Sequence, residues 1–433
     1  MRVDSPAPRG SSKRISIGIC AGIFALLVLP GAIRWVLEGS PPASGDVSSA
    51  PADAPASGKN AARGEAVPAV TDERDSPTVE RAGVDASPLY KDAFALYDRL
   101  TDKDKEMLLR PSAEVDAEKA EALFAKIQPI MELLRRGAAA DYCDWGLGEY
   151  RLETPLPQIT KSQTLGKVAL WNAAYRFPSD AGGAIDDLAT RARLGHDIAD
   201  TLIGLLVDAS FEKSAADLLR VNAPAFDEAT RTKTAAFLAA STIDRDIETC
   251  MAGEESFGRD IYKQLASQSP DERAKLIATM GLADADDVDL AARSRRERAE
   301  AVVRDSDLLR AEMEFVQKAQ AQMAEAMHWP DAQFEAWMQQ FDASHSAEHP
   351  FAATTMPVYR GIRTQLQARR IEREMLSVGL AVFASGPAET NRSRDPVTGR
   401  PFDYVQTPAG FELRSTFQSK GKPVAMSFAQ PKQ

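Results

Sequence analysis

The sequence contains few of the residues from which catalytic centres are usually built. Its 433 residues include only three cysteines and four histidines. It has no G-x-S-x-G nucleophile elbow, no P-loop and no G-x-G-x-x-G fingerprint, the common patterns of serine hydrolases and nucleotide-binding proteins. Basic residues are also in deficit, 52 against 63 acidic ones, whereas nucleic-acid-binding proteins usually have a basic face. We therefore expect no cofactor and no nucleic-acid partner.

Long apolar runs are scarce as well, and residues 15–37 form the one run that is long enough to cross a membrane. About 20 apolar residues in a helix span a hydrocarbon core of ~30 Å. Basic residues outnumber acidic ones before the run, where Asp4 is the only acid. The basic residues there are Arg2, Arg9, Lys13 and Arg14. This asymmetry predicts that residues 1–14 lie in the cytoplasm and the remainder of the chain outside it.

These features predict a bacterial inner-membrane protein with residues 15–37 as its single transmembrane helix and most of the chain in the periplasm. The alternative is a cleaved signal peptide, which shares the basic start and the apolar core. The apolar run is longer than a usual signal core, and no clean A-x-A cleavage site follows it. Both observations favour an anchor that is retained.

Residues 38–88 contain no Leu, Ile, Met, Phe, Tyr or Trp and are rich in Ala, Pro, Ser and Gly. Such a segment buries too little apolar surface to offset its chain entropy, so we expect a disordered linker. A flexible chain of this length has a root-mean-square span of about 40 Å. Its predicted role is to hold the folded domain away from the membrane.

Residues 89–386 have the apolar periodicity of a multi-helix domain, and the predicted fold class is mainly α. The clearest unit is a helical hairpin at 165–194, interrupted by a Pro- and Gly-containing turn. Two long helices are expected at 286–329 and 356–383. The acidic stretch around Glu254 is expected to be less regular, and residues 342–344 are expected to form a loop or a cap.

The pattern changes in residues 387–433, which predict a small antiparallel β-hairpin packed on the helical domain. Apolar side chains alternate at 402–404 and again at 411–413, as on two strands. The intervening loop has its glycine late, as in hairpin loops. Residues 424–428 are a candidate third strand.

The C-terminal motifs resemble those of a group of uncharacterised bacterial single-pass envelope proteins with an exported helical domain. The motifs are the run YRGIRTQL at 359–366 and the pattern Asp395-Pro396, Gly399, Pro401, Tyr404, Gly410-Phe411 and Leu413. The second motif is also similar to the terminal hairpin of type II secretion pseudopilins. That resemblance makes Asp395 a candidate calcium ligand, although one carboxylate is well short of the six to eight oxygens that calcium prefers. No prepilin-peptidase site precedes Ile15, so we do not expect a filament subunit.

Two cysteines, Cys143 and Cys250, lie in the region expected outside the cytoplasm. They can form one disulfide if the compartment is oxidising, as a periplasm is. The alternative is two separate thiols, each behaving as a small buried hydrophobe. The sequence is compatible with a disulfide and with two separate thiols.

One catalytic motif occurs, H-x-x-E-H, formed by His345, Glu348 and His349. On a helix, two histidines four residues apart can share a zinc ion while the glutamate activates its water. Pro350 follows at once, where the helix of such enzymes continues, and no glutamate follows Glu412 to serve as a distant third ligand. The motif therefore supports a zinc-dependent hydrolase only as an alternative.

The leading interpretation is a non-enzymatic scaffold or partner-binding protein of the cell envelope, with an envelope protein as its partner. A folded domain on a long linker, without a catalytic pattern, favours this class. A third possibility is a lipid- or ligand-binding helical body lined by the region from Trp145 to Trp171. Tightly packed aromatic side chains between helices explain those residues equally well.

Overall fold

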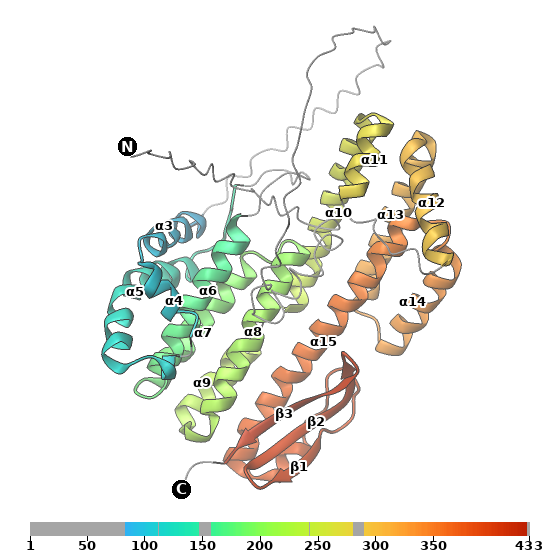
Figure 1. The fold of residues 1–433 in the computed structure, drawn as a ribbon. Helices are drawn as coiled ribbons and strands as arrows, with labels where there is room; N and C mark the ends of the chain where they lie inside the picture. The colour runs from blue at the N-terminus through green and yellow to red at the C-terminus, as the bar shows by residue number, and fades with distance from the viewer. Residues whose placement is uncertain (1–82, 111, 147–156, 242, 280–289, 431–433) are drawn as a thin grey trace, which may run out of the picture.

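The computed structural model describes residues 83–110, 112–146, 157–241, 243–279 and 290–430. These residues form a body of helices that is followed by a small sheet near the C-terminus (Figure 1). The prediction of a mainly α fold with a small C-terminal antiparallel sheet is confirmed. None of the helices described is both long and apolar enough to cross a membrane.

The predicted membrane segment lies outside the residues that the structure describes. This applies to residues 1–14, to the anchor at 15–37 and to most of the linker at 38–88. The last residues of that linker are described, and there Ala86 and Ser87 are buried. The described part of the folded body therefore includes the last residues of the predicted linker.

Three helices begin the body: α3 (Ser87–Asp98), α4 (Asp102–Met107) and α5 (Ala117–Ala138). Thr101 starts α4 with a capping box, in which its side chain accepts the Asp104 N–H and the Asp104 side chain accepts the Thr101 N–H. The apolar faces of α3 and α5 are buried against each other in one core cluster.

The predicted helical hairpin is confirmed as α6 (Pro157–Arg176) and α7 (Ala181–His196). Asp180 ends the turn between them, because its carboxylate accepts the Gly183 N–H at 2.8 Å and caps α7. The two glycines that the sequence places in the turn thus lie in the first turn of α7.

The next two helices, α8 (Leu202–Asn222) and α9 (Glu228–Ala239), each begin at a side-chain cap. The Thr201 hydroxyl accepts the Gly204 N–H, and the Asp227 carboxylate accepts the Thr230 N–H. About half of the residues of α8 are buried, and the helix contacts both α7 and the long helix that precedes the sheet.

The acidic stretch around Glu254 is not irregular, so that prediction is wrong. It lies inside α10 (Ile243–Ser267), a continuous helix that precedes α11 (Pro270–Thr279). Glu254 is 1% exposed and its Oε1 accepts the Leu202 N–H at 3.0 Å. Glu254 lies on the buried face of α10 because it accepts a hydrogen bond from the first turn of α8. No local sequence pattern reveals this contact between distant residues.

The prediction of a single helix at 286–329 is also wrong. The structure has two helices there, α12 (Leu290–Arg304) and α13 (Ser306–Ala326). Asp305 has an extended conformation between them. Its carboxylate accepts the N–H groups of Asp307 and Leu308 at 2.8 and 3.1 Å and caps α13. The apolar periodicity continues across the break, which explains the error.

The last two helices are α14 (Asp331–His345) and α15 (Pro350–Ser385). Residues 342–344 belong to α14, so the loop predicted there is wrong. α15 contains the predicted helix at 356–383 and runs through the body to the sheet (Figure 1).

The C-terminal sheet has three antiparallel strands in the order β1 (Asp403–Thr407), β2 (Gly410–Ser419) and β3 (Lys422–Ala429). The predicted hairpin is therefore extended by the candidate third strand. The sheet packs on α15, where the ring of Phe428 lies over Gly379. A Cβ built on Gly379 would be 2.2 Å from the ring. α15 thus links the sheet to the helices that line the candidate site.

Candidate functional site

A cavity of about 200 Å³ lies between α7, α8, α9 and α15. Its apolar walls are formed by Ala189, Ala192, Ala216, Phe237, Leu238 and Ala240. Its acidic groups are Asp208, Glu212 and Glu372. Its basic groups are Arg193, Lys213, Arg369 and Arg373, and His196 and Ser241 complete the lining. Charged groups of both signs and apolar surface therefore meet in one small space.

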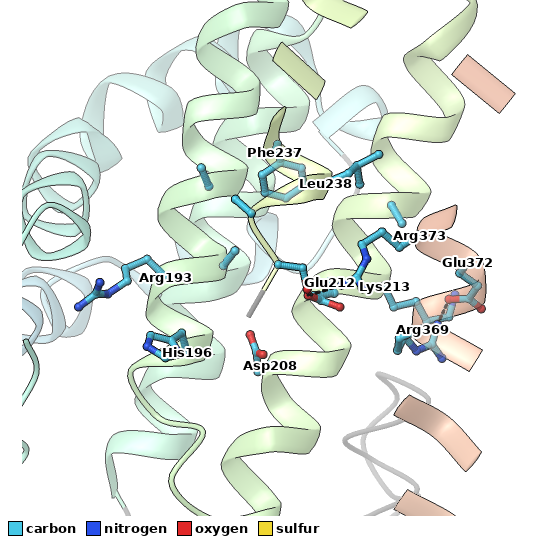
Figure 2. A pocket seen from close by; sticks show the side chains of 15 residues that line it. Arg193, His196, Asp208, Glu212, Lys213, Phe237, Leu238, Arg369, Glu372 and Arg373 are labelled. Carbon is cyan, nitrogen blue, oxygen red and sulfur yellow. Dashed lines mark hydrogen bonds and ion pairs between the residues drawn. The ribbon is translucent and has the colours of Figure 1, made fainter. Parts of the chain in front are cut away.

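Helical spacing explains why these side chains face the same space. Asp208 and Glu212 are four residues apart on α8, and Arg369 and Arg373 are four apart on α15. Side chains at this spacing lie on one face of a helix. Figure 2 shows the two acids between His196 of α7 and the arginines of α15.

Asp208 is the most deeply buried charged residue of the cavity, with 3% of its surface exposed. Burial raises the pKa of its carboxyl group well above the usual value, and the nearby acids Glu212 and Asp246 raise it further. Across the described ranges, no donor is hydrogen-bonded to this carboxyl group. Gly195 makes room for it, because a Cβ there would be 2.1 Å from Asp208 Oδ1.

Glu212 is also largely buried, with its side chain 18% exposed. Its Oε1 accepts the Ser241 hydroxyl at 2.5 Å and lies 3.8 Å from Nη1 of Arg373. Burial raises the pKa of the Glu212 carboxyl group, while the Ser241 hydrogen bond and the charge of Arg373 oppose that rise. Arg373 Nη1 is buried and makes no hydrogen bond to any residue that the structure describes.

His196 lies beside these acids at the C-terminal end of α7. Its Nδ1 is 2.5 Å from Oδ1 of Asp246, a residue of α10 that is 1% exposed. This pair fixes the orientation of the imidazole ring.

Three of the four basic residues are paired at the edge of the cavity. Arg193 bonds to Asp197 at 2.9 Å and points away from the acids (Figure 2). Lys213 bonds to Asp217 at 2.8 Å, and Arg369 pairs with Glu372. Arg373 is therefore the cavity arginine that is least satisfied by its neighbours.

This arrangement is suited to binding. The lining of the cavity includes the carboxyl group of Asp208, the partly exposed side chain of Arg373 and apolar walls. In the part of the chain that the structure describes, no three His, Cys, Asp or Glu side chains are placed to hold a metal ion.

The H-x-x-E-H motif does not lie on one helix. His345 is the last residue of α14, a turn follows, and His349 precedes α15. The ring of His349 stacks on Phe315 at 3.5 Å, and its Nδ1 lies 2.9 Å from Glu312 Oε2. These contacts use the His349 ring for packing, and Glu348 is exposed. The geometry gives the zinc-hydrolase alternative no support.

The two tryptophans that bound the candidate region from Trp145 to Trp171 take part in aromatic packing, and residues 147–156 between them lie outside the described residues. Trp145 stacks on Tyr90 at 5.7 Å and donates a hydrogen bond to the Asp197 carbonyl at 2.7 Å. Trp171 stacks on Tyr175 at 5.6 Å. These tryptophans occupy space between helices, as the packing interpretation predicts.

The structure also places the two cysteines that were considered for a disulfide and the aspartate that was considered as a calcium ligand. Cys143 and Cys250 are unbonded thiols in different core clusters. Asp395 is 2% exposed and accepts the N–H groups of Val397 and Thr398 at 2.8 and 2.9 Å. Its carboxylate therefore holds the turn before β1.

The sequence reasoning missed the cavity residues. A signal was present in Asp208 and Glu212, two acids one turn apart in an apolar helix. No local signal links these acids to Arg373, which follows more than 150 residues later. None links His196 to Asp246 either.

Comparison with known proteins gives no assignment. No protein-family model, no curated protein and no solved structure matches this chain.

Proposed function

We propose that this chain is a single-pass bacterial envelope protein whose exported helical body binds a small ligand without transforming it chemically. The supporting observation is the Asp208 carboxyl group, which is 3% exposed and faces the cavity with no donor from the described residues. An unsatisfied buried polar group costs about 1–3 kcal/mol. A ligand that supplies the missing contact removes this cost.

The membrane part of the proposal is supported by the sequence. The apolar run at 15–37 has the length of a membrane-spanning helix, and the basic residues before it favour a cytoplasmic N-terminus. The linker at 38–88 would place the helical body in the periplasm, away from the inner membrane. Protease added to spheroplasts tests this topology. We expect it to remove the helical body, whereas full protection of the chain would contradict export.

The proposal also includes an envelope protein as partner. Its support is the long linker and the resemblance of residues 395–413 to the terminal hairpin of pseudopilins. Crosslinking in intact cells, followed by purification through a C-terminal tag, tests this point. We expect specific recovery of envelope components, and recovery of nothing above background would contradict a stable partner.

Ligand binding is tested by filling the cavity. Ala192 lines it, so Ala192→Leu adds volume where the ligand would lie. Ala235→Leu, at an exposed position of α9, is the matched control. The full chain in detergent is incubated with a periplasmic small-molecule extract and examined by native mass spectrometry. We expect a bound species in the unaltered chain and the control, and its loss in Ala192→Leu. Equal binding in all three proteins, or in none, would contradict the proposal.

A further inference from the structure

We infer that the cavity binds an aliphatic α-amino acid of about the size of leucine, with its ammonium group at Asp208 and Glu212 and its carboxylate at Arg373. This inference rests on the proposed function and specifies its ligand. Figure 2 shows Asp208, Glu212 and Arg373 among the side chains that line the cavity.

The acidic side of the cavity calls for a hydrogen-bond donor. Asp208 is 97% buried and accepts no hydrogen bond from the described residues, and Glu212 accepts one from Ser241. An ammonium group has three N–H donors and a positive charge, so one group can contact both acids. Charge-assisted hydrogen bonds of this kind are about twice as strong as neutral ones.

The basic side of the cavity calls for an acceptor. The Arg373 side chain is 26% exposed, and the 3.8 Å separation of its Nη1 from Glu212 Oε1 exceeds a direct hydrogen bond. A carboxylate matches the planar fork of a guanidinium group. The ligand's carboxylate can therefore bind the Arg373 guanidinium group, to which Glu212 makes no direct hydrogen bond.

Both charges must be on the same small molecule. A cation alone would meet Arg373, and an anion alone would meet two buried acids. An α-amino acid carries its ammonium and carboxylate groups on one carbon atom, which suits the short separation of Glu212 and Arg373.

The remaining walls set the size and polarity of the side chain. Phe237 and Leu238 cover one end of the cavity, and alanines from α7 and α8 line its sides. A cavity of about 150 Å³ accommodates benzene, so about 200 Å³ has space for roughly eight to ten non-hydrogen atoms. An aliphatic amino acid such as leucine fits this volume.

Binding is expected to release a proton. Burial raises the pKa of Asp208, whereas an ammonium group beside it favours the ionised form, so we expect ligand binding to lower this pKa. A proton that leaves Asp208 on binding passes to the buffer. The charged and titratable groups that share its surroundings are Arg191, Arg193 and His196 of α7, Glu212 of α8, Asp246 of α10, and Arg369, Glu372 and Arg373 of α15. Burial also lowers the pKa of the Arg191 guanidinium to about 9.

Three probes test the ligand class on the full chain in detergent. They are leucine, 3-methylbutylamine, which lacks the carboxylate, and 4-methylpentanoate, which lacks the ammonium group. Calorimetric titration in two buffers of different ionisation enthalpy gives the affinity and the number of protons released. We expect leucine to bind at least about tenfold more tightly than either analogue and to release protons to the buffer. Equal binding of the amine or the acid would overturn the inference.

Two variants locate the ligand, each with a matched control. We expect Asp208→Asn and Arg373→Gln to weaken leucine binding by about 10- to 100-fold, and Asp208→Asn to abolish proton release. Asp92→Asn on α3 and Arg310→Gln on α13, both exposed and outside the cavity lining, should change the leucine affinity by no more than about twofold. Unchanged binding in both cavity variants would overturn the inference. Because the probe comparison uses the unaltered chain, it stands even if a variant does not fold.

The test distinguishes this inference from the proposed function. If leucine fails but a molecule of the periplasmic extract binds and is lost in Ala192→Leu, the inference is wrong and the binding function holds. If nothing binds to the cavity, both are wrong.

Discussion

Replacing Glu254 by glutamine should remove a pH-dependent loss of stability. The Glu254 side chain is 1% exposed, its Oε1 accepts the Leu202 N–H, and its Oε2 has no partner among the described residues. Burial raises the pKa of this carboxyl group from 4.5 to about 7. Glutamine keeps the acceptor for Leu202 and stays neutral at every pH.

The raised pKa fixes the sign of the effect. The folded state binds the Glu254 proton more tightly than the unfolded state, so the stabilisation is complete below about pH 4.5 and is lost as the pH rises through about 7. With these two pKa values, the unaltered chain loses about 2.5 kcal/mol through Glu254 between about pH 5 and about pH 8. Glu254→Gln should not lose this contribution.

Urea unfolding of the full chain at both pH values measures the effect. We expect Glu254→Gln to gain roughly 2–3 kcal/mol relative to the unaltered chain between the lower and the higher pH. Glu255→Gln is the matched control, because its side chain is 47% exposed and pairs with Arg259. It should follow the unaltered chain. The same pH slope in Glu254→Gln and the unaltered chain would refute the reasoning.

Two further predictions concern glycines in helices. Gly379→Ala places a Cβ 2.2 Å from the Phe428 ring and should lower the free energy of unfolding by about 1–3 kcal/mol in urea titrations. Gly361→Ala, in the same helix with nothing within 4 Å of the added Cβ, should instead raise it by about 0.5–1 kcal/mol. If the two variants change the free energy of unfolding in the same direction and by a similar amount, the described packing of the sheet on α15 is wrong. Gly195→Ala directs a Cβ at Asp208 Oδ1 and should weaken leucine binding by at least about tenfold in calorimetric titrations, and unchanged affinity would contradict the placement of that carboxyl group.

The helices were predictable where the apolar period was strong and a local stop signal was present. The hairpin of α6 and α7, the helix α15 and the strands after residue 402 follow such signals. The break at Asp305 was missed because the apolar period continues across it and the cap is a single residue.

The candidate site was not predictable from local patterns. Asp208 and Glu212 share a helix face in the sequence, but Arg373 reaches them only because α15 packs against α8. His345 and His349 show the opposite case, since their spacing matches a motif while the helix ends between them. Chemistry that depends on contacts between distant helices is visible only in the fold.

Equilibrium dialysis of radiolabelled leucine against the full chain in detergent tests the central claim most directly. The cavity between α7, α8, α9 and α15 predicts saturable binding of about one leucine per chain, with loss of binding in Ala192→Leu and retention in Ala235→Leu. No saturable binding, or equal binding in the filled-cavity variant, would contradict it.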